Sequence, residues 1–250
     1  MFFWNKPSVI TVDCFTYLES VILNYPIASA SKFYPESIKS VPAAINAKVT
    51  NNPNSNLTTD VETVRHCHGL NALYSSGIVL PAWDTFDVEM YGDNSFLINP
   101  PGSIKGDYHP RWQYGNSLYG DSSHIKLISP WFIKEKTGVK FIWMHPTWNR
   151  SDTATDISIL PAIVDYKKQN VTHINAFIKN GSIVSFKAGE PLVHMIPMSE
   201  KKIKINIHLV SHEEYKKNEE TYYSHMRLKN HRNLIYPNLF KRKKKCPFGF

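Results

Sequence analysis

Short stretches in which apolar and polar residues alternate recur along most of the chain. Residues 85–91 alternate with a period of two, and residues 77–81 form a short apolar run bounded by glycine and proline. Segments of the same strand-like character are residues 9–15, 124–128, 139–144, 157–164, 173–178, 183–186, 192–196 and 204–210. So many short strands at close spacing, without the longer helical patterns that parallel crossovers need, predict a mainly β protein built as an antiparallel sandwich or barrel.

Two segments outside these strands have helical character. Residues 59–74 are the first, and residues 211–229 are the second, in which Ser211 and Glu214 have the spacing of a capping box. The second segment predicts a C-terminal helix that closes the β-rich body. We therefore expect an N-terminal extension packed on the body over residues 1–55, a β-rich core domain over residues 56–212, and a helix with a basic tail over residues 213–250.

The composition is that of a globular protein in a reducing compartment. The 250 residues are 42% hydrophobic and 20% charged, which excludes disorder for most of the chain. No apolar run approaches the length of a membrane-spanning helix, and the N-terminal residues lack the apolar region of a secretory signal. The three cysteines, Cys14, Cys67 and Cys246, fit neither a disulfide framework nor a zinc knuckle. We expect a soluble protein of the cytoplasm.

The positive charge is concentrated at the C-terminal end. Of the 29 Lys and Arg residues, 21 precede residue 226 and balance the 21 Asp and Glu residues, which all lie in the same part of the chain. Five of the remaining basic residues are consecutive: Lys241, Arg242, Lys243, Lys244 and Lys245. This run predicts an electrostatic contact with nucleic acid, an acidic protein or an anionic surface. The alternative is a solvated terminal run that aids solubility, because so few charges bind weakly and in a salt-sensitive way.

The sequence contains no dinucleotide-binding glycine motif, phosphate-binding loop, serine-hydrolase elbow, zinc-protease helix or EF-hand loop. The densest group of metal-ligand residues is His66 and His68 with Cys67 between them. Two histidines at this spacing on a strand would point to one face and could bind Fe(II), Zn or Mn in a cupin-like or jelly-roll barrel. The next carboxylate along the chain is Asp84, which is too far away for the cupin pattern. The alternative is an exposed or hydrogen-bonded histidine pair beside a buried Cys67, and no cofactor follows from the sequence.

A second candidate site begins where an apolar strand ends at Met144. Arg150 could hold a carboxylate or phosphate in a bidentate pair, and Trp148 or Trp143 could form the wall of an apolar pocket. Asp165 follows an apolar strand and His194 lies within one, so burial would shift their pKa values and suit them as a base or a ligand. The complete candidate pocket is Trp143, His145, Asn149, Arg150, Asp152, Asp165 and His194. The alternatives are a turn stabilised by Asn149 and Asp152, and a core histidine at position 194.

Several scattered motifs occur in a specific order over residues 8–212. They are Cys67 with residues 77–81, residues 126–133 with Gly138 and His145-Pro146, the pair Val164-Asp165, and residues 189–197. Together they resemble an uncharacterised protein family found in bacteria and in large tailed marine phages. The family carries no assigned reaction, so the resemblance implies only a phage or bacterial origin. The protein would then act in the host cytoplasm or in a virion, with a virion or phage protein as a possible partner.

The last third of the chain is also similar to the closing half of the β-clip fold of dUTPases and dCTP deaminases. The similarity consists of an apolar strand, Asp165, residues 175–177 and then residues 189–194. By this analogy Asp165 would lie at the substrate sugar. The Gly-Arg-Ser-Ser phosphate-binding segment of that family is missing, because residues 149–152 match only its Arg-Ser pair.

Two functional hypotheses follow from the sequence. The first is a non-catalytic protein that binds another macromolecule through its basic C-terminal segment. The second is a small-molecule enzyme or binder, dependent on a nucleotide or a metal, with a pocket in the β-rich domain. The separation of charge along the chain and the lack of a catalytic motif favour the first.

Overall fold

The computed structural model describes residues 9–48, 58–92, 95–102, 104–114, 120–146, 148 and 156–235, with side chains up to residue 224 except that of Lys48. Four sheets occur in these residues. The six-stranded sheet contains β11 (Ile157–Ile159), β13 (Val171–Lys179), β9 (Ser122–Glu135), β1 (Val9–Thr16) and β16 (Lys202–Leu209) in this order, with β8 (Lys105–Asp107) paired to β9. The five-stranded sheet has the order β12 (Ala162–Asp165), β10 (Lys140–Met144), β15 (Pro191–Pro197), β5 (Ile78–Pro81) and β2 (Ala28–Ser29).

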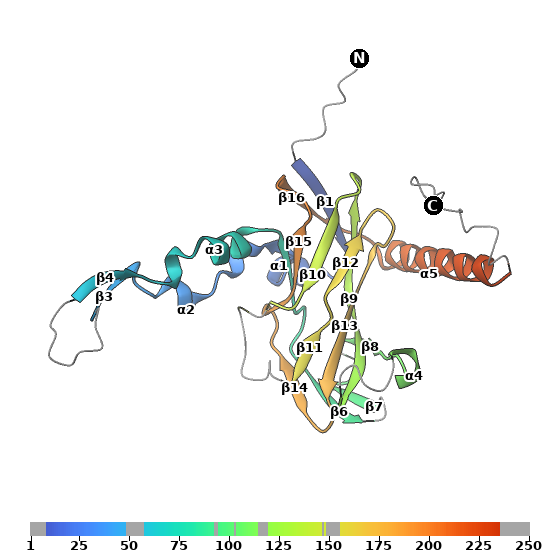
Figure 1. Cartoon of the computed structure of the whole chain (residues 1–250). Coiled ribbons are helices and arrows are strands. Elements are labelled where there is room, and N and C mark those ends of the chain that lie inside the picture. The colour runs from blue at the N-terminus through green and yellow to red at the C-terminus, as the bar shows by residue number, and fades with distance from the viewer. Residues whose placement is uncertain are drawn as a thin grey trace, which may run out of the picture.

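The other elements are smaller. A three-stranded sheet consists of β14 (Ile183–Phe186), β6 (Phe86–Gly92) and β7 (Ser95–Asn99), and a hairpin consists of β3 (Ala44–Lys48) and β4 (Thr58–Glu62). The helices are α1 (Glu19–Asn24), α2 (Glu36–Lys39), α3 (His68–Ser75), α4 (Arg111–Tyr114) and α5 (His212–Ile235), with 3-10 turns η1 (Ala30–Phe33) and η2 (Val64–His66). Figure 1 shows the two large sheets at the centre of the molecule, the β3–β4 hairpin at one side and α5 at the other.

The core lies between the inner faces of the sheets. Along β1 the alternating residues Ile10, Val12 and Cys14 are fully buried, as their period-two pattern predicts. The five-stranded sheet contributes side chains such as Phe141 and Met195 to the same hydrophobic cluster. The mainly β, sandwich-like fold with a C-terminal helix is therefore confirmed, and none of the described sheets closes into a barrel. Most strand pairs are antiparallel, but β1 and β16 pair in parallel, with Val9 opposite Lys202.

Two predicted segments differ in detail from the structure. Residues 157–164 form two strands in different sheets, because Pro161 has no N–H to donate and the chain crosses over at Leu160. The helix predicted for residues 59–74 was only partly correct. Its first residues form β4, which is rich in β-branched residues and pairs with β3, and helix α3 starts only at His68.

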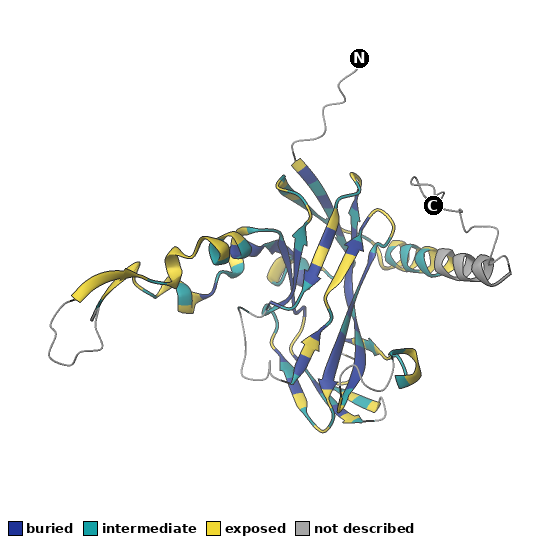
Figure 2. Cartoon of the chain, in the orientation of Figure 1, coloured by how far each residue is buried: buried dark blue, intermediate teal, exposed yellow. Residues whose placement is uncertain are grey.

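The β3–β4 hairpin extends away from the sandwich and is exposed along its length (Figures 1 and 2). The predicted boundary between residues 55 and 56 falls in the sequence between β3 and β4, outside the described residues. Upstream of it, β1 is an inner strand of the six-stranded sheet. The N-terminal part of the chain therefore contributes directly to the core.

Helix α5 begins as the capping-box spacing predicts, because the Ser211 hydroxyl accepts a hydrogen bond from the Glu214 backbone N–H at 3.1 Å. Its first half packs on the outer face of the six-stranded sheet, where the Tyr215 hydroxyl donates to the Ser129 carbonyl at 3.2 Å. From there the helix runs outward from the sandwich (Figure 1). No described helix is long and apolar enough to cross a membrane.

Candidate functional site

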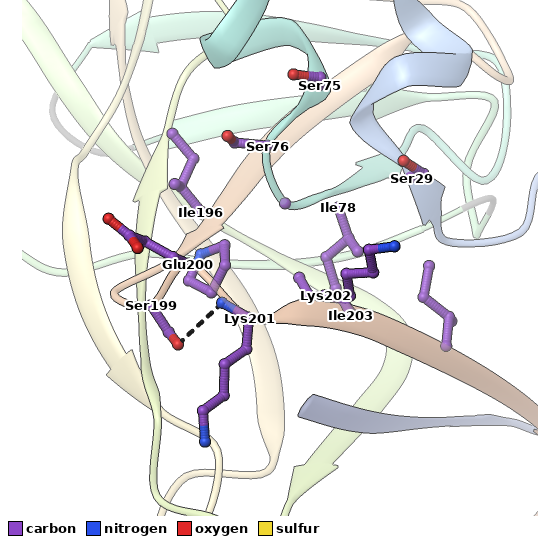
Figure 3. Close-up of a pocket in the computed structure, with 13 residues that line it drawn as sticks. Ser29, Ser75, Ser76, Ile78, Ile196, Ser199, Glu200, Lys201, Lys202 and Ile203 are labelled. Carbon is purple, nitrogen blue, oxygen red and sulfur yellow. Dashed lines mark hydrogen bonds between the residues drawn. The ribbon is translucent and has the colours of Figure 1, made fainter. Parts of the chain in front are cut away.

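A cavity of about 400 Å³ opens on one side of the sandwich, between the edge strands β16 and β2. Its floor consists of the four isoleucines Ile78, Ile196, Ile203 and Ile205. Ile203 and Ile205 lie opposite Ile10 and Val12 in the register of the two strands, so they point toward the core. Since β16 is an edge strand, both remain only half-buried. The sheet geometry thus leaves apolar side chains at an open side of the core (Figure 3).

The rim of the cavity is polar. It contains hydroxyl groups from Ser76 and Ser199 and the charged residues Glu200, Lys201 and Lys202. The Ser199 hydroxyl accepts a hydrogen bond from the Lys201 backbone N–H at 3.3 Å, which orders the turn before β16. The cavity therefore combines an apolar floor with hydroxyl and ammonium groups at its opening.

Gly77 fixes the path of the chain at this rim. Its φ of +82° lies in the left-handed region, and a Cβ atom there would lie 2.3 Å from the Met195 carbonyl oxygen. Only glycine allows α3 to lead into β5 so close to β15. The adjacent Ser76 carbonyl accepts a hydrogen bond from His194 Nε2 at 2.7 Å, which ties the rim to the five-stranded sheet.

His194 occupies the outer face of that sheet and is completely buried. Its ring packs edge-on against Trp148, with ring centroids 5.7 Å apart, and Trp148 in turn contacts Tyr74 at 5.2 Å. Burial lowers the pKa of His194. Because Nε2 donates to the Ser76 carbonyl, the neutral ring carries its proton there, and Nδ1 has no hydrogen-bond partner in the described part of the chain. The environment is that of a core histidine covered by aromatic rings.

The described members of the pocket predicted from the sequence lie on different faces. Trp143 points into the core, where its Nε1 donates to the Tyr166 hydroxyl at 2.7 Å. Asp165 lies on the outer face and forms an ion pair of 3.1 Å with Lys168, which is the main cause that lowers the pKa of this carboxyl. Asp165 pairs with Lys140 and His194 with Met144, so the two are about 13 Å apart along the strand direction.

None of these three side chains lines the cavity of about 400 Å³. His145 follows β10 and is half-buried. Asn149, Arg150 and Asp152 lie outside the described residues. The structure therefore does not bring Trp143, Asp165 and His194 together.

The candidate metal ligands do not lie on a strand. His66 ends the turn η2 and His68 begins α3, and both side chains are exposed. Cys67 between them is also exposed, so the expectation that it is buried was wrong. His66 Nδ1 lies 3.7 Å from Glu62 Oε1 in the exposed hairpin region. Within the residues that the structure describes, no group of three or more His, Cys, Asp and Glu side chains is placed to share a metal ion.

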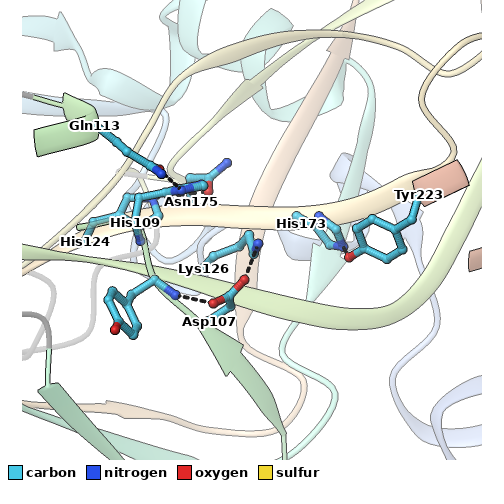
Figure 4. Close-up of polar contacts among 9 residues, drawn as sticks. Asp107, His109, Gln113, His124, Lys126, His173, Asn175 and Tyr223 are labelled. Carbon is cyan, nitrogen blue, oxygen red and sulfur yellow. Dashed lines mark hydrogen bonds and ion pairs between the residues drawn. The ribbon is translucent and has the colours of Figure 1, made fainter. Parts of the chain in front are cut away.

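A polar cluster on the outer face of the six-stranded sheet was not predicted (Figure 4). His124 Nδ1 accepts a hydrogen bond from the His109 N–H at 3.1 Å, and Nε2 lies 3.2 Å from Asn175 Oδ1. Burial lowers the pKa of His124 to about 4. Beside it, Lys126 and Asp107 form an ion pair of 2.6 Å.

The same face carries His173, whose Nε2 is 3.3 Å from the Tyr223 hydroxyl of α5. Burial also lowers the pKa of His173 to about 4. The alternation of His124 with Lys126 on β9 and of His173 with Asn175 on β13 was a signal for this face. The contacts of this cluster join β8, α4 and α5 to the sheet.

No protein-family model, curated protein or solved structure matches the chain. The resemblances to the phage and bacterial family and to the dUTPase fold therefore stay predictions. The basic run at residues 241–245 lies outside the described residues.

Proposed function

We propose that the protein is a non-catalytic interaction protein that binds an acidic partner through its basic C-terminal segment. The partner is a nucleic acid or an acidic protein surface. The observation that carries this proposal is the combination of a body with balanced charge and a helix that extends away from the sandwich and precedes the charged segment in the sequence.

Helix α5 has the properties of a spacer. Its contacts with the body extend from His212, whose ring centroid lies 4.8 Å from that of Tyr17, to Tyr223. Within this stretch the Asn218 side chain accepts a hydrogen bond from Lys134 Nζ at 3.4 Å. The helix then continues to Ile235, which adds about 18 Å at the rise of an α-helix. The end of the helix thus lies away from the sandwich, and the charged segment follows this end in the sequence.

The small-molecule enzyme hypothesis has less support. Trp143, Asp165 and His194 lie apart, and the carboxylate that the dUTPase analogy would place at a sugar is paired with Lys168. A nucleotide- or metal-dependent reaction therefore has no assembled set of groups in the described residues. By the resemblance to the phage and bacterial family, we extend the proposal to a viral protein of the host cytoplasm or a virion, with a phage protein as one candidate for the acidic partner.

The proposal is tested by replacing Lys241, Arg242, Lys243, Lys244 and Lys245 with glutamine in the full chain. Retention on immobilised duplex DNA and on immobilised polyglutamate is then compared with that of the unchanged protein. The matched control replaces the same number of exposed body lysines with glutamine: Lys140, Lys167, Lys179, Lys187 and Lys204. We expect the tail variant to lose retention on at least one acidic matrix while the control keeps it. Equal retention by both variants would overturn the role of the tail.

A further inference from the structure

The cavity between β16 and β2 has the size and position of a ligand site. Its volume of about 400 Å³ lies within the range of small-molecule pockets in proteins. It lies at an open side of the sandwich, so a ligand reaches it without separation of paired strands. Gly77 and the Ser76–His194 hydrogen bond hold its rim in place without a ligand.

The floor of the cavity favours an apolar body. Ile78 is almost completely buried, whereas Ile203 and Ile205 are only half-buried although they point inward. Covering such partly exposed aliphatic side chains removes apolar surface from water and is favourable. A ligand with an alkyl or aryl portion would complete the packing that the edge strand leaves open.

The rim favours a negative charge. Lys202 lines it together with one carboxylate residue, Glu200, and the hydroxyl of Ser76 adds a neutral hydrogen-bond donor, whereas the Lys201 side chain extends away from the other lining residues (Figure 3). Ammonium and hydroxyl groups at the mouth of an apolar cavity suit an anionic head group such as a carboxylate, sulfonate or phosphate. The charged rim and the apolar floor of the cavity are thus complementary to a small amphipathic anion.

We propose that this cavity binds a small anionic molecule with an apolar body, in which the negative head group contacts Lys202 and the rim hydroxyl groups while the body covers Ile203 and Ile205. The residues that line this cavity all precede the C-terminal segment in the sequence. A chain with the glutamine substitutions at residues 241–245 keeps it.

The experiment measures binding of decanoate to the full chain by isothermal titration calorimetry, below the concentration at which decanoate forms micelles. Decylammonium has the same alkyl chain and the opposite charge, and serves as the ligand control. We expect saturable one-to-one binding of decanoate and at least tenfold weaker binding of decylammonium, because the head group loses its charged partner. Equal binding of the two ligands, or no saturable binding of decanoate, would overturn the proposal.

The matched variants are Lys202→Glu and Lys204→Glu, which change neighbouring exposed lysines of the same strand. Only Lys202 lines the cavity. We expect about a tenfold loss of decanoate affinity for Lys202→Glu and no more than a twofold change for Lys204→Glu. Circular dichroism melting confirms that both variants fold, and equal losses in the two variants would contradict the assigned position of the head group.

Discussion

Asp13 on β1 and His208 on β16 are joined across the parallel strand pair, with 3.0 Å between Asp13 Oδ1 and His208 Nε2. The same carboxylate oxygen accepts a hydrogen bond from Asn206 Nδ2 at 2.9 Å, and this is the main cause that lowers the pKa of Asp13 below 3.8. The His208 ring also stacks on Phe15, with centroids 4.6 Å apart. Asp13 therefore fixes the position of the edge strand that borders the cavity.

The first prediction concerns acid stability. Because the pKa of Asp13 is lower in the folded state, its stabilising effect is complete above its unfolded value of 3.8 and is lost as the pH falls through the folded value. We expect Asp13→Asn to be less stable than the wild type at neutral pH, by about 1 kcal/mol, and to lose less stability below pH 4. Urea denaturation between pH 2.5 and 7 measures this. Asp60→Asn in the exposed hairpin is the control. If the free energy of unfolding falls equally with pH in Asp13→Asn and in the wild type, the Asp13 carboxyl is not the source of this acid sensitivity.

The second prediction concerns the buried histidines. The pKa of His124 is lowered to about 4, whereas an unfolded histidine titrates near 6.5, so the unfolded state binds more protons between these values. Stability is therefore lost as the pH falls from about 6.5 to about 4, by up to about 3 kcal/mol for this residue. In His124→Gln the contribution of this residue should disappear, while that of His173, whose pKa is also lowered to about 4, remains. Thermal unfolding across the same pH range tests it, with the exposed His66→Gln as control, and an unchanged pH profile in His124→Gln would refute the prediction.

The third prediction separates steric clash from backbone strain at two glycines. Gly77 and Gly181 have nearly the same φ, +82° and +79°, but a Cβ atom on Gly181 would meet no atom within 4 Å. Gly181→Ala should cost about 1 kcal/mol from the left-handed backbone alone. Gly77→Ala should cost at least about 3 kcal/mol, because the methyl group would overlap the Met195 carbonyl. Comparable losses in chemical denaturation would show that the contact with β15 is looser than described.

The fourth prediction concerns Glu135, a buried carboxylate at the end of β9. Its oxygens accept hydrogen bonds from the backbone N–H groups of Thr137 at 2.6 Å, Gly138 at 2.7 Å and Val139 at 3.1 Å. Glu135→Ala removes the acceptor for these donors and should lower the free energy of unfolding by about 3 kcal/mol. The exposed Glu220→Ala is the control and should change stability by less than about 0.5 kcal/mol. A loss at Glu135 as small as that of the control would mean that water replaces the carboxylate.

The sequence predicted the strands well where buried and exposed residues alternate and where glycine or proline marks the turns. Residues 183–186, for example, form β14 with the bounds expected from the sequence. It could not predict that residues 9–16 lie between β9 and β16, because strand order depends on long-range pairing rather than on local pattern. The cavity escaped prediction for the same reason. Ile78 and Ile203 have the pattern of ordinary core residues, and only the order of strands leaves them at an open side.

The pocket predicted from the sequence depended on strand residues, and the sequence pattern alone does not show which face of the sheet such residues take. Asp165 was expected at the end of an apolar strand and His194 within one, but Asp165 is paired with Lys168 and His194 is hydrogen-bonded to the Ser76 carbonyl. A one-residue difference in register decides which face a side chain takes, so Trp143 and Met144 point in opposite directions. Only the charge separation, which needs no fold to be recognised, carries over directly into the proposed function.

The most direct test of the central claim is the salt dependence of binding to a 20-base-pair DNA duplex, measured by fluorescence anisotropy. If the five consecutive basic residues contact phosphates, the slope of log K against log salt concentration for the full chain should exceed in magnitude that of the glutamine variant by about 4. Two results together would contradict a basic C-terminal contact segment: equal slopes and equal DNA affinities for the two chains, and equal binding of the two chains to polyglutamate.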